Sequence, residues 1–254
     1  MKEKTLGNRM KEYEAVTDTK LIKGMPVIIR LDGRAFHTFT KGFNKPFDVV
    51  FNDCMTLTMQ HLCENIGNCI FGYTQSDEIT IVLFDKDEKS EAWFDNRLQK
   101  LTSLASSITT LYFNKMLFEY YNNQQEETIS CKKLFQATFD ARAFNIPKED
   151  VCNNIIWRQN DAAKNSINSV AQSYFTHEEL QGKNTSEMQD MLMLQHNYNW
   201  SKDTPTRFKR GSACIKQEVE VETPNGKTMR TKWIIDNEMP ILVAERWYVE
   251  NLLK

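Results

Sequence analysis

A chain of 254 residues, 41% of them hydrophobic and 26% charged, can bury a core of ordinary size, which excludes a disordered or fibrous protein. Its formal net charge of −2 excludes a uniformly basic coat for nucleic acid but leaves room for local basic patches. No stretch approaches the roughly 20 apolar residues of a membrane span, and residues 1–14 lack the apolar segment of a signal peptide. We therefore expect a cytoplasmic protein with no membrane partner. The six cysteines form no Cys-x-x-Cys pair, so we expect free thiols rather than a zinc site.

Five elements are expected before residue 147. Runs rich in β-branched residues predict strands, and apolar residues at helical spacing predict helices. Asp48 is the expected N-cap of the first helix. In chain order we expect a strand, a helix, a hairpin, a helix and a strand, over residues 27–31, 46–65, 69–84, 90–121 and 134–144. This order predicts an α+β fold, a mainly antiparallel sheet with helices packed on one face.

The pattern changes at Pro147, which suits the start of a helix. We therefore expect two parts, a catalytic domain over residues 1–146 and a smaller C-terminal lobe over 147–254. Capping patterns beginning at Thr176 and Ser186 predict two short helices in that lobe. Alternating residues on either side of the sequence Pro-Asn-Gly at 224–226 predict a terminal hairpin whose glutamates and basic residues pair across the strands.

Two carboxylates, Asp32 and Asp77, stand at the ends of apolar strands. If those ends meet, repulsion between the carboxylates favours a divalent cation, and oxygen ligands that share the ion with phosphate suit Mg²⁺. Neighbouring residues of a strand point to opposite faces, so we expect Asp77 to join Asp32 and Glu78 to point to the other face. The alternative is that Asp32-Gly33 and Ser76-Asp77-Glu78 are ordinary turn chemistry.

Seven blocks of the sequence bear on this choice. They are RLDGRAFHTF, NKPFD, GYTQSDEITIVLF, WFDNRLQK, FDAR, WRQNDAAKNSIN and FKRG, at residues 30–39, 44–48, 72–84, 93–100, 139–142, 157–168 and 208–211. In this order they resemble the signature blocks of the tRNA-His guanylyltransferase family, enzymes that add nucleotides in the 3′-to-5′ direction. The resemblance implies a polymerase-palm-like (ferredoxin-like) fold.

The resemblance also implies the site. Asp32 and Asp77 would be the catalytic residues and, with the carbonyl of Gly33, the ligands of two Mg²⁺ ions. ATP would activate a 5′-monophosphate end, and GTP or another nucleoside triphosphate would then be added. The implied nucleotide-binding residues are Asp32, Gly33, Arg34, Ala35, Phe36, His37, Lys45, Ser76, Asp77, Arg97 and Lys100. We expect the main-chain amides of Arg34 to His37 to cradle phosphate, and Arg97 and Lys100 to share one helix face as cationic clamps.

RNA contacts are expected from the C-terminal part. One helix there carries a polar stripe, which is often no more than the wet side of a helix. The family places this helix near the nucleotide and the tRNA end, and a basic cluster follows that could grip phosphates. The implied RNA-binding residues are Arg158, Asn165, Lys202, Arg207, Lys209 and Arg210.

One departure from the family pattern concerns residues 163–169. Eukaryotic members carry His-Ile-Asn-Asn-Leu-Tyr-Asn where this chain has AKNSINS, so the histidine is absent. In this the chain resembles the bacterial and archaeal branch, whose members prefer template-dependent repair of 5′-truncated tRNA. The expected partners are tRNA and nucleoside triphosphates, in a homotetramer. Two alternatives remain, a palm-fold nucleotide cyclase and a non-catalytic RNA-binding protein.

Overall fold

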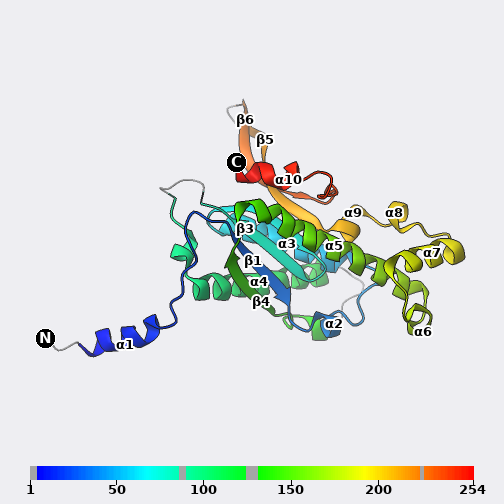
Figure 1. Ribbon diagram of the computed structural model, residues 1–254, viewed down its shortest axis with the longest axis horizontal. Helices are drawn as coiled ribbons and strands as arrows, with labels where there is room; N and C mark the ends of the chain where they lie inside the picture. Colours follow the sequence, from blue (N-terminus) through cyan, green and yellow to red (C-terminus); the bar gives the residue numbers. More distant parts are fainter. Residues whose placement is uncertain (1–4, 86–89, 124–130, 224–225) are drawn as a thin grey trace.

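A computed structural model describes residues 5–85, 90–123, 131–223 and 226–254. Within these residues the centre of the molecule is a six-stranded antiparallel sheet of order β4-β1-β3-β2-β5-β6 (Figure 1). The strands are β1 (Val27–Gly33), β2 (Cys69–Gln75), β3 (Glu78–Leu83), β4 (Phe139–Asn145), β5 (Ser212–Thr223) and β6 (Gly226–Asp236). The predicted α+β class with an antiparallel sheet is confirmed.

In the described residues, three long helices pack against the sheet, and the other helices are shorter. No helix in the described ranges is both long enough and apolar enough to cross a bilayer. The helices are α1 (Leu6–Ala15), α2 (Phe36–Phe39), α3 (Val49–Asn65), α4 (Leu98–Asn123), α5 (Lys148–Tyr174), α6 (His177–Leu180), α7 (Thr185–His196), α8 (Trp200–Asp203), α9 (Thr206–Arg210) and α10 (Trp247–Glu250), with short 3-10 turns at η1 (Trp93–Asn96), η2 (Cys131–Lys133) and η3 (Asn251–Leu253).

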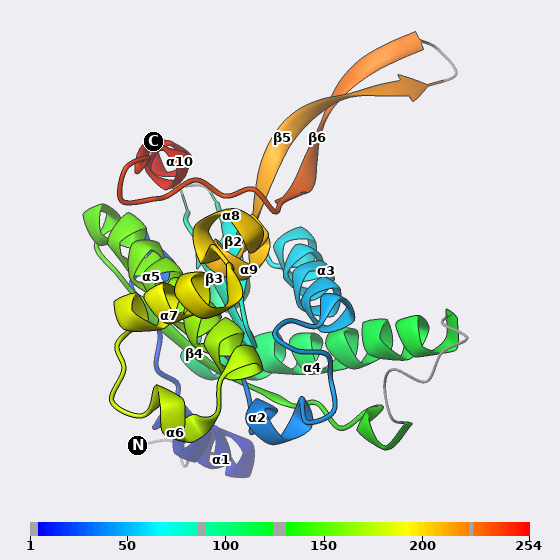
Figure 2. The ribbon, with the colours of Figure 1, turned by 90° about the vertical axis from the view of Figure 1, so that its right-hand side faces the viewer.

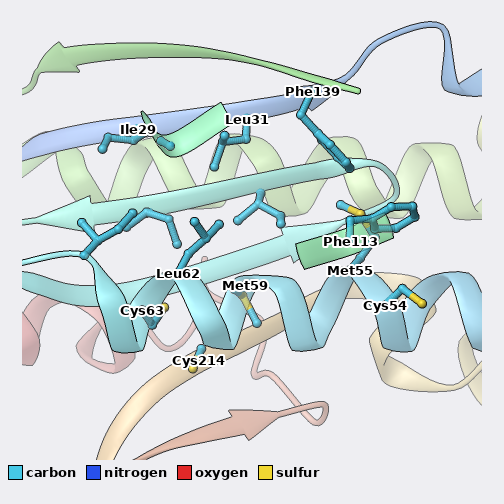
Figure 3. Packing of buried hydrophobic residues seen from close by; sticks show 14 of the residues in the cluster. Ile29, Leu31, Cys54, Met55, Met59, Leu62, Cys63, Phe113, Phe139 and Cys214 are labelled. Carbon is cyan, nitrogen blue, oxygen red and sulfur yellow. The ribbon is translucent and has the colours of Figure 1, made fainter. Parts of the chain in front are cut away.

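Helices cover both faces of the sheet, not one as expected. On one face, Ile29 and Leu31 of β1 pack against α3 and α4, with Met59 and Phe113 in the same core (Figure 3). On the other face, Ile28 packs in a second core with residues of α5 and of the C-terminal segment. Figure 2 shows α5 on the opposite side of the sheet from α3. The physical reason is that 27–31 is a nearly continuous apolar run, which requires burial on both sides.

The part of the chain after residue 147 shares the sheet and its second core. Helix α5 packs on one face of the sheet. Strand β5 extends the sheet by pairing with β2, with Cys214 opposite Gly72. Beyond this, the end of α5 joins α6, α7 and α8 in a smaller third core. The far ends of β5 and β6 project from the body as a two-stranded arm (Figure 2).

Local capping predictions can be compared directly with the structure. Asp48 caps α3, its carboxylate accepting the amide of Phe51 at 2.8 Å, as predicted. Thr176 forms the predicted capping box with Glu179. The second box is centred on Asn184 and Glu187, so the prediction of Ser186 as its start is wrong by two residues.

The helix predicted to begin at residue 90 begins at Leu98. Before it, η1 contains Phe94 and Asp95 at positive φ, a backbone that does not continue an α-helix. Asp95 is held there by ion pairs with Lys20 and Lys23.

The terminal hairpin is confirmed in its two strands. One predicted charge pair is present, between Lys227 Nζ and Glu220 Oε2 at 3.2 Å. Pro224 and Asn225 of the predicted turn lie outside the described residues.

Candidate active site

Asp32 and Asp77 come together at one end of the sheet. Asp32 is the sixth residue of β1, and Asp77 lies in the two-residue turn that joins β2 to β3. The amide of Gly33 donates to the carbonyl of Asp77 at 3.0 Å, which ties the two segments together. Ser76 adopts a positive φ of 48° in this turn, and its Oγ donates to Asp77 Oδ1 at 3.0 Å. The structure thus brings together the two carboxylates that the sequence singled out.

The electrostatics of this pair suit a cation. Burial raises the pKa of the Asp77 carboxyl, and the negative charge of Asp32 adds to that effect. The Arg142 Nη2 lies 3.9 Å from Asp32 Oδ2, but both side chains are partly exposed, so solvent weakens the interaction. Within the described ranges, no cluster of three or more His, Cys, Asp or Glu side chains is placed to hold a metal. Further ligands to an ion here would be main-chain carbonyls, water or substrate phosphates, the shell that Mg²⁺ favours.

A cavity of about 390 Å³ opens beside the turn of Asp77. Its walls come from the segment between β1 and α3, the start of α3, the end of β2, and helices α5 and α9. Phe47 and Phe208 stack in its lining with ring centroids 4.5 Å apart and planes 3° apart. Seven of the residues predicted for nucleotide or RNA binding line this cavity. They are Phe36, His37, Lys45, Ser76, Asp77, Asn165 and Arg207.

The segment after β1 supplies the cavity only in part. The amide of Arg34 donates to the carbonyl of Thr138 at 2.9 Å, so its expected role in a phosphate cradle is wrong. Ala35 adopts a left-handed backbone and turns the chain into α2. Phe36 is buried, and a Cβ at Gly33 would lie 2.4 Å from its ring, so glycine permits this close packing beside Asp32.

Arg97 and Lys100 lie at the other end of the sheet from Asp32 and Asp77. Arg97 precedes α4 rather than lying in it. The expectation that Arg97 and Lys100 share one helix face is therefore wrong. Arg97 Nε pairs with Asp18 at 3.5 Å, and Lys100 Nζ lies 5.6 Å from the Phe94 ring. Both line a second cavity of about 440 Å³ that contains neither carboxylate.

The distance between the two ends follows from the strand. The segment around Arg97 lies near the start of β1: the carbonyl of Asn96 accepts the amide of Leu21, and the next residue, Ile22, donates to the side chain of Asn145, which is opposite Val27. At about 3.3 Å per residue, Val27 and Asp32 are roughly 17 Å apart along β1. Arg97 and Lys100 therefore do not reach the carboxylate pair of their own chain.

Glu78 lies on the same face of the sheet as Asp32. The register of β1 and β3 places the two residues directly opposite each other, so the expectation that Glu78 points away is wrong. The alternation rule fails because Asp77 lies in the turn and not in the strand. Glu78 Oε1 accepts a bond from Arg158 Nε at 2.7 Å. Burial raises the pKa of Glu78, and the charges of Arg158 and Arg30 oppose that rise.

Arg158, expected to contact RNA, is 8% exposed. Besides its bond to Glu78, its Nη2 pairs with Asp161 at 2.9 Å, and its guanidinium lies 4.4 Å from the centre of the Trp157 ring. With both carboxylates bound, the side chain anchors α5 to β3 and is not a free cation. This arrangement argues against direct RNA contact by Arg158.

The predicted basic cluster divides into buried and accessible members. Lys209 is buried, its Nζ donates to the carbonyl of Ser201, and burial followed by the charge of Arg210 lowers its pKa. Arg207 lines the cavity with its guanidinium 2.8 Å from Asp53 Oδ1.

Of the remaining cations, Arg210 donates to the carbonyl of Met239 at 3.3 Å, and Lys202 is exposed on α8.

Several residues that line the cavity were not among the predicted site residues, and two of them carry buried side-chain amides. Asn52 and Gln75 are buried polar residues that line it. Gln75 is part of the TQSDE block and could have been suspected from its position next to Ser76. Asn52 gave no signal, because a single asparagine among the apolar residues of a helix has no characteristic spacing.

Comparison with known proteins identifies a family whose model covers five of the seven sequence blocks. The family model described as tRNAHis guanylyltransferase matches residues 7–147. An uncharacterized protein, R259, of Acanthamoeba polyphaga mimivirus is 30% identical over 98% of this chain and 88% of its own length. The tRNA(His) guanylyltransferase of Schizosaccharomyces pombe is 26% identical over 84% of this chain and 81% of its own.

Among solved structures, a bacterial tRNA(His) guanylyltransferase (Thg1)-like protein in complex with ATP is 39% identical, with a TM-score of 0.85 over 98% of this chain and 99% of that one. A complex with GTP, also of a bacterial protein of that description, is 38% identical with a TM-score of 0.82, over the same shares of both chains. The tRNA(His) guanylyltransferase of Saccharomyces cerevisiae, at 22% identity and a TM-score of 0.65 over 86% of this chain and 94% of that one, shares the fold.

Proposed function

Because the chain belongs to the tRNAHis guanylyltransferase family, a family of nucleotidyltransferases, we propose that it extends the 5′ end of tRNA by 3′-to-5′ nucleotide addition. The observation that supports this most directly is the position of Asp77, which lies against Asp32 and lines the cavity. The similar bacterial proteins bound to ATP and GTP support a nucleoside triphosphate as the ligand of that cavity.

The proposed reaction has two transfers. A 5′-monophosphate oxygen of the RNA attacks the α-phosphorus of ATP and pyrophosphate leaves, which gives an adenylylated 5′ end. The 3′-hydroxyl of an incoming nucleotide then attacks the 5′ phosphorus of that end, and AMP leaves. Each transfer is an in-line displacement at phosphorus, so the protein's task is to align the groups and to stabilise negative charge.

Asp32, Asp77 and the carbonyl of Gly33 would hold two Mg²⁺ ions. When bound, such ions lower the pKa of an attacking hydroxyl and stabilise charge on a leaving group. The raised pKa of Asp77 fits this assignment, since a carboxylate pair without a cation resists full ionisation. Lys45 and His37 line the cavity beside the pair and would contact the triphosphate there.

We propose that the specific activity is template-dependent repair of 5′-truncated tRNA. The chain lacks the histidine of the eukaryotic run at 163–169, and the similar bacterial structures are of guanylyltransferase-like proteins. The accessible predicted residues for tRNA are Asn165 and Arg207, which line the cavity, and Lys202 on α8.

We propose a homotetramer in which copies complete one another's sites. Arg97 and Lys100 lie in a cavity of their own at the opposite end of the sheet from Asp77. If they clamp a triphosphate beside the metal ions, as their sequence block implies, that triphosphate is bound at the carboxylate pair of another copy.

Purified protein incubated with Mg²⁺, labelled GTP and a tRNA lacking its 5′ nucleotide tests the proposed function. RNA-linked label is the expected result. A cyclic nucleotide product would instead identify a cyclase, and tRNA binding with neither product would identify a non-catalytic RNA-binding protein. Sequencing the 5′ ends formed with each of the four triphosphates offered separately tests whether the added base follows the template.

A further inference from the structure

An exposed tryptophan lies near the carboxylate pair. Trp157, on α5, is 53% exposed, although proteins usually bury most of a tryptophan side chain. The Arg158 guanidinium lies 4.4 Å from the centre of its ring, and the Arg30 guanidinium lies 5.7 Å from it. Because Arg158 is fixed by its buried bond to Glu78, these contacts hold the ring in one position. An exposed aromatic ring held in this way is a surface on which another flat group can stack.

This ring lies outside the cavity. Arg30 and Asp32 are two residues apart on β1, so their side chains point to the same face of the sheet. Their Cα atoms are about 7 Å apart along the strand. Among the described residues, Asp77 lines the cavity, whereas Asp32, Arg30 and Trp157 do not. The carboxylate pair therefore lies between the cavity and the surface that carries Trp157.

A transfer between two substrates requires a surface for each of them. The cavity, at about 390 Å³, is in the size range of a site for one small molecule. If a nucleoside triphosphate occupies it, the RNA end reaches the carboxylates from the open side, where Trp157 lies.

The charge on that side also suits RNA. The Nε of Arg30 has no hydrogen-bond partner in the part of the chain that the structure describes, and its distance to Glu78 Oε2 is 3.9 Å. Arg142, directly opposite Arg30 on β4, is about half exposed. Arginines beside an exposed aromatic ring are the combination that single-stranded nucleic acid binds.

We propose that Trp157 is a positioning residue that stacks an unpaired base at the end of the RNA substrate. The inference rests on the proposed function, because a tRNA that lacks its 5′ nucleotide has an unpaired base on the opposite strand. Bases inside a duplex are covered by their neighbours, whereas an unpaired base offers a free face to an aromatic side chain. Stacking is tolerant of base identity, so Trp157 holds the template base and leaves its pairing edge to the incoming nucleotide.

A purely structural role for Trp157 would be to cover the buried pair of Glu78 and Arg158. The two roles differ in what they affect. A cover affects the stability of the protein and its binding of every RNA alike. A stacking surface affects the binding of RNA that carries the unpaired base.

The test is filter binding of the full chain to two forms of a tRNA that lacks its 5′ nucleotide. One form carries the unpaired base, and the other has an abasic residue at that position. The unmodified protein should bind the first form about tenfold more tightly. Trp157→Leu should remove this difference, and Trp157→Phe should keep most of it, since phenylalanine still stacks. Trp247→Leu is the matched control, because Trp247 is 57% exposed on α10 and does not line the cavity.

Two further measurements separate stacking from packing. Trp157→Leu should bind a non-hydrolysable GTP analogue as the unmodified protein does, since the ring does not line the cavity. Photo-crosslinking requires no variant and remains decisive if Trp157→Leu does not fold. A 5-iodouridine at the unpaired position should crosslink to Trp157, as located by mass spectrometry of the digested protein.

The inference is overturned if the unmodified protein binds both RNAs equally, if folded Trp157→Leu keeps the difference between them, or if the crosslink lies only on other residues. Nucleotide incorporation together with any of these results overturns the role of Trp157 alone. The expected difference and crosslink without any incorporation support stacking and count against the proposed function.

Discussion

The Oε1 of Glu78 lies 2.7 Å from the Nε of Arg158, with both side chains buried and 80 residues apart in the sequence. This ion pair connects α5 to β3, the strand that follows the turn of Asp77. A buried pair of this kind is costly to break on one side, because the remaining charge loses its closest buried partner: Arg158 keeps only the partly exposed Asp161, and Glu78 keeps only Arg30, 3.9 Å away.

We therefore predict strong coupling between these two residues. Glu78→Gln and Arg158→Met should each lower the free energy of unfolding by about 3–5 kcal/mol, and the double variant should lose much less than the sum. Urea denaturation of the four proteins measures the coupling. The exposed pair Lys227 and Glu220 is the control cycle, with an expected coupling of about 0–1 kcal/mol. Additive losses at Glu78 and Arg158 would contradict the anchoring role.

The carboxylate pair should be essential for transfer. Asp77→Asn and Asp32→Asn should lower the rate of nucleotide incorporation at least about a hundredfold with little change in the circular dichroism spectrum, since each would remove a proposed metal ligand. Asp190→Asn removes a surface carboxylate on α7 and should leave the rate unchanged. Near-normal incorporation by folded Asp77→Asn would reject the site.

The pH dependence of stability should reveal the strain at Asp77. Burial and the charge of Asp32 raise its pKa above the ordinary value of about 3.9. At pH values between the ordinary pKa of the unfolded chain and the raised pKa of the folded chain, the folded chain binds more protons than the unfolded chain. Without divalent cations, the free energy of unfolding should therefore fall as the pH rises through this interval. Glu78, whose pKa burial also raises, contributes with the same sign.

Thermal unfolding at a series of pH values in a chelator measures this slope. Asp77→Asn should make it shallower, and Asp190→Asn should not. Added Mg²⁺ should restore stability above the interval, because it binds the ionised folded state. An unchanged slope in Asp77→Asn would show that its carboxyl is not responsible.

Complementation between copies tests the position of Arg97. Asp77→Asn and Arg97→Ala should each be inactive alone. If Arg97 acts at another copy's carboxylates, mixed assemblies contain some sites with both residues intact, and unfolding and refolding the two variants together should recover part of the activity. If mixed assemblies fold but recover no activity, Arg97 does not act at the carboxylates of another copy. Lys100→Ala should complement Asp77→Asn in the same way.

Arg207 should contribute to RNA affinity through its charge. Arg207→Ala should weaken tRNA binding and reduce the slope of log affinity against log salt by about 1, as expected for one lost phosphate contact. Filter binding at several salt concentrations provides both quantities. Lys115→Ala, which removes a cation on α4, is the control. An unchanged slope in Arg207→Ala would show that its guanidinium serves only the ion pair with Asp53.

Features that depend only on neighbouring residues could be predicted from the sequence. The apolar run of β1, the capping of α3 by Asp48 and the hairpin around Asp77 were predictable, because strand alternation and end-capping are local interactions. The same holds for the blocks that carry the family resemblance. Asp32 and Asp77 could be paired from sequence because each lies close to the end of an apolar strand.

Which further residues share that site depends on the tertiary structure. Arg158 is buried against Glu78, Arg97 lies beyond the opposite end of β1, and Asn52 lines the cavity from α3. Each of these positions depends on strand register or on packing between segments far apart in the sequence. A side chain's charge and spacing do not specify such contacts, since the free energy of burying it is set by the partner that the fold brings to it.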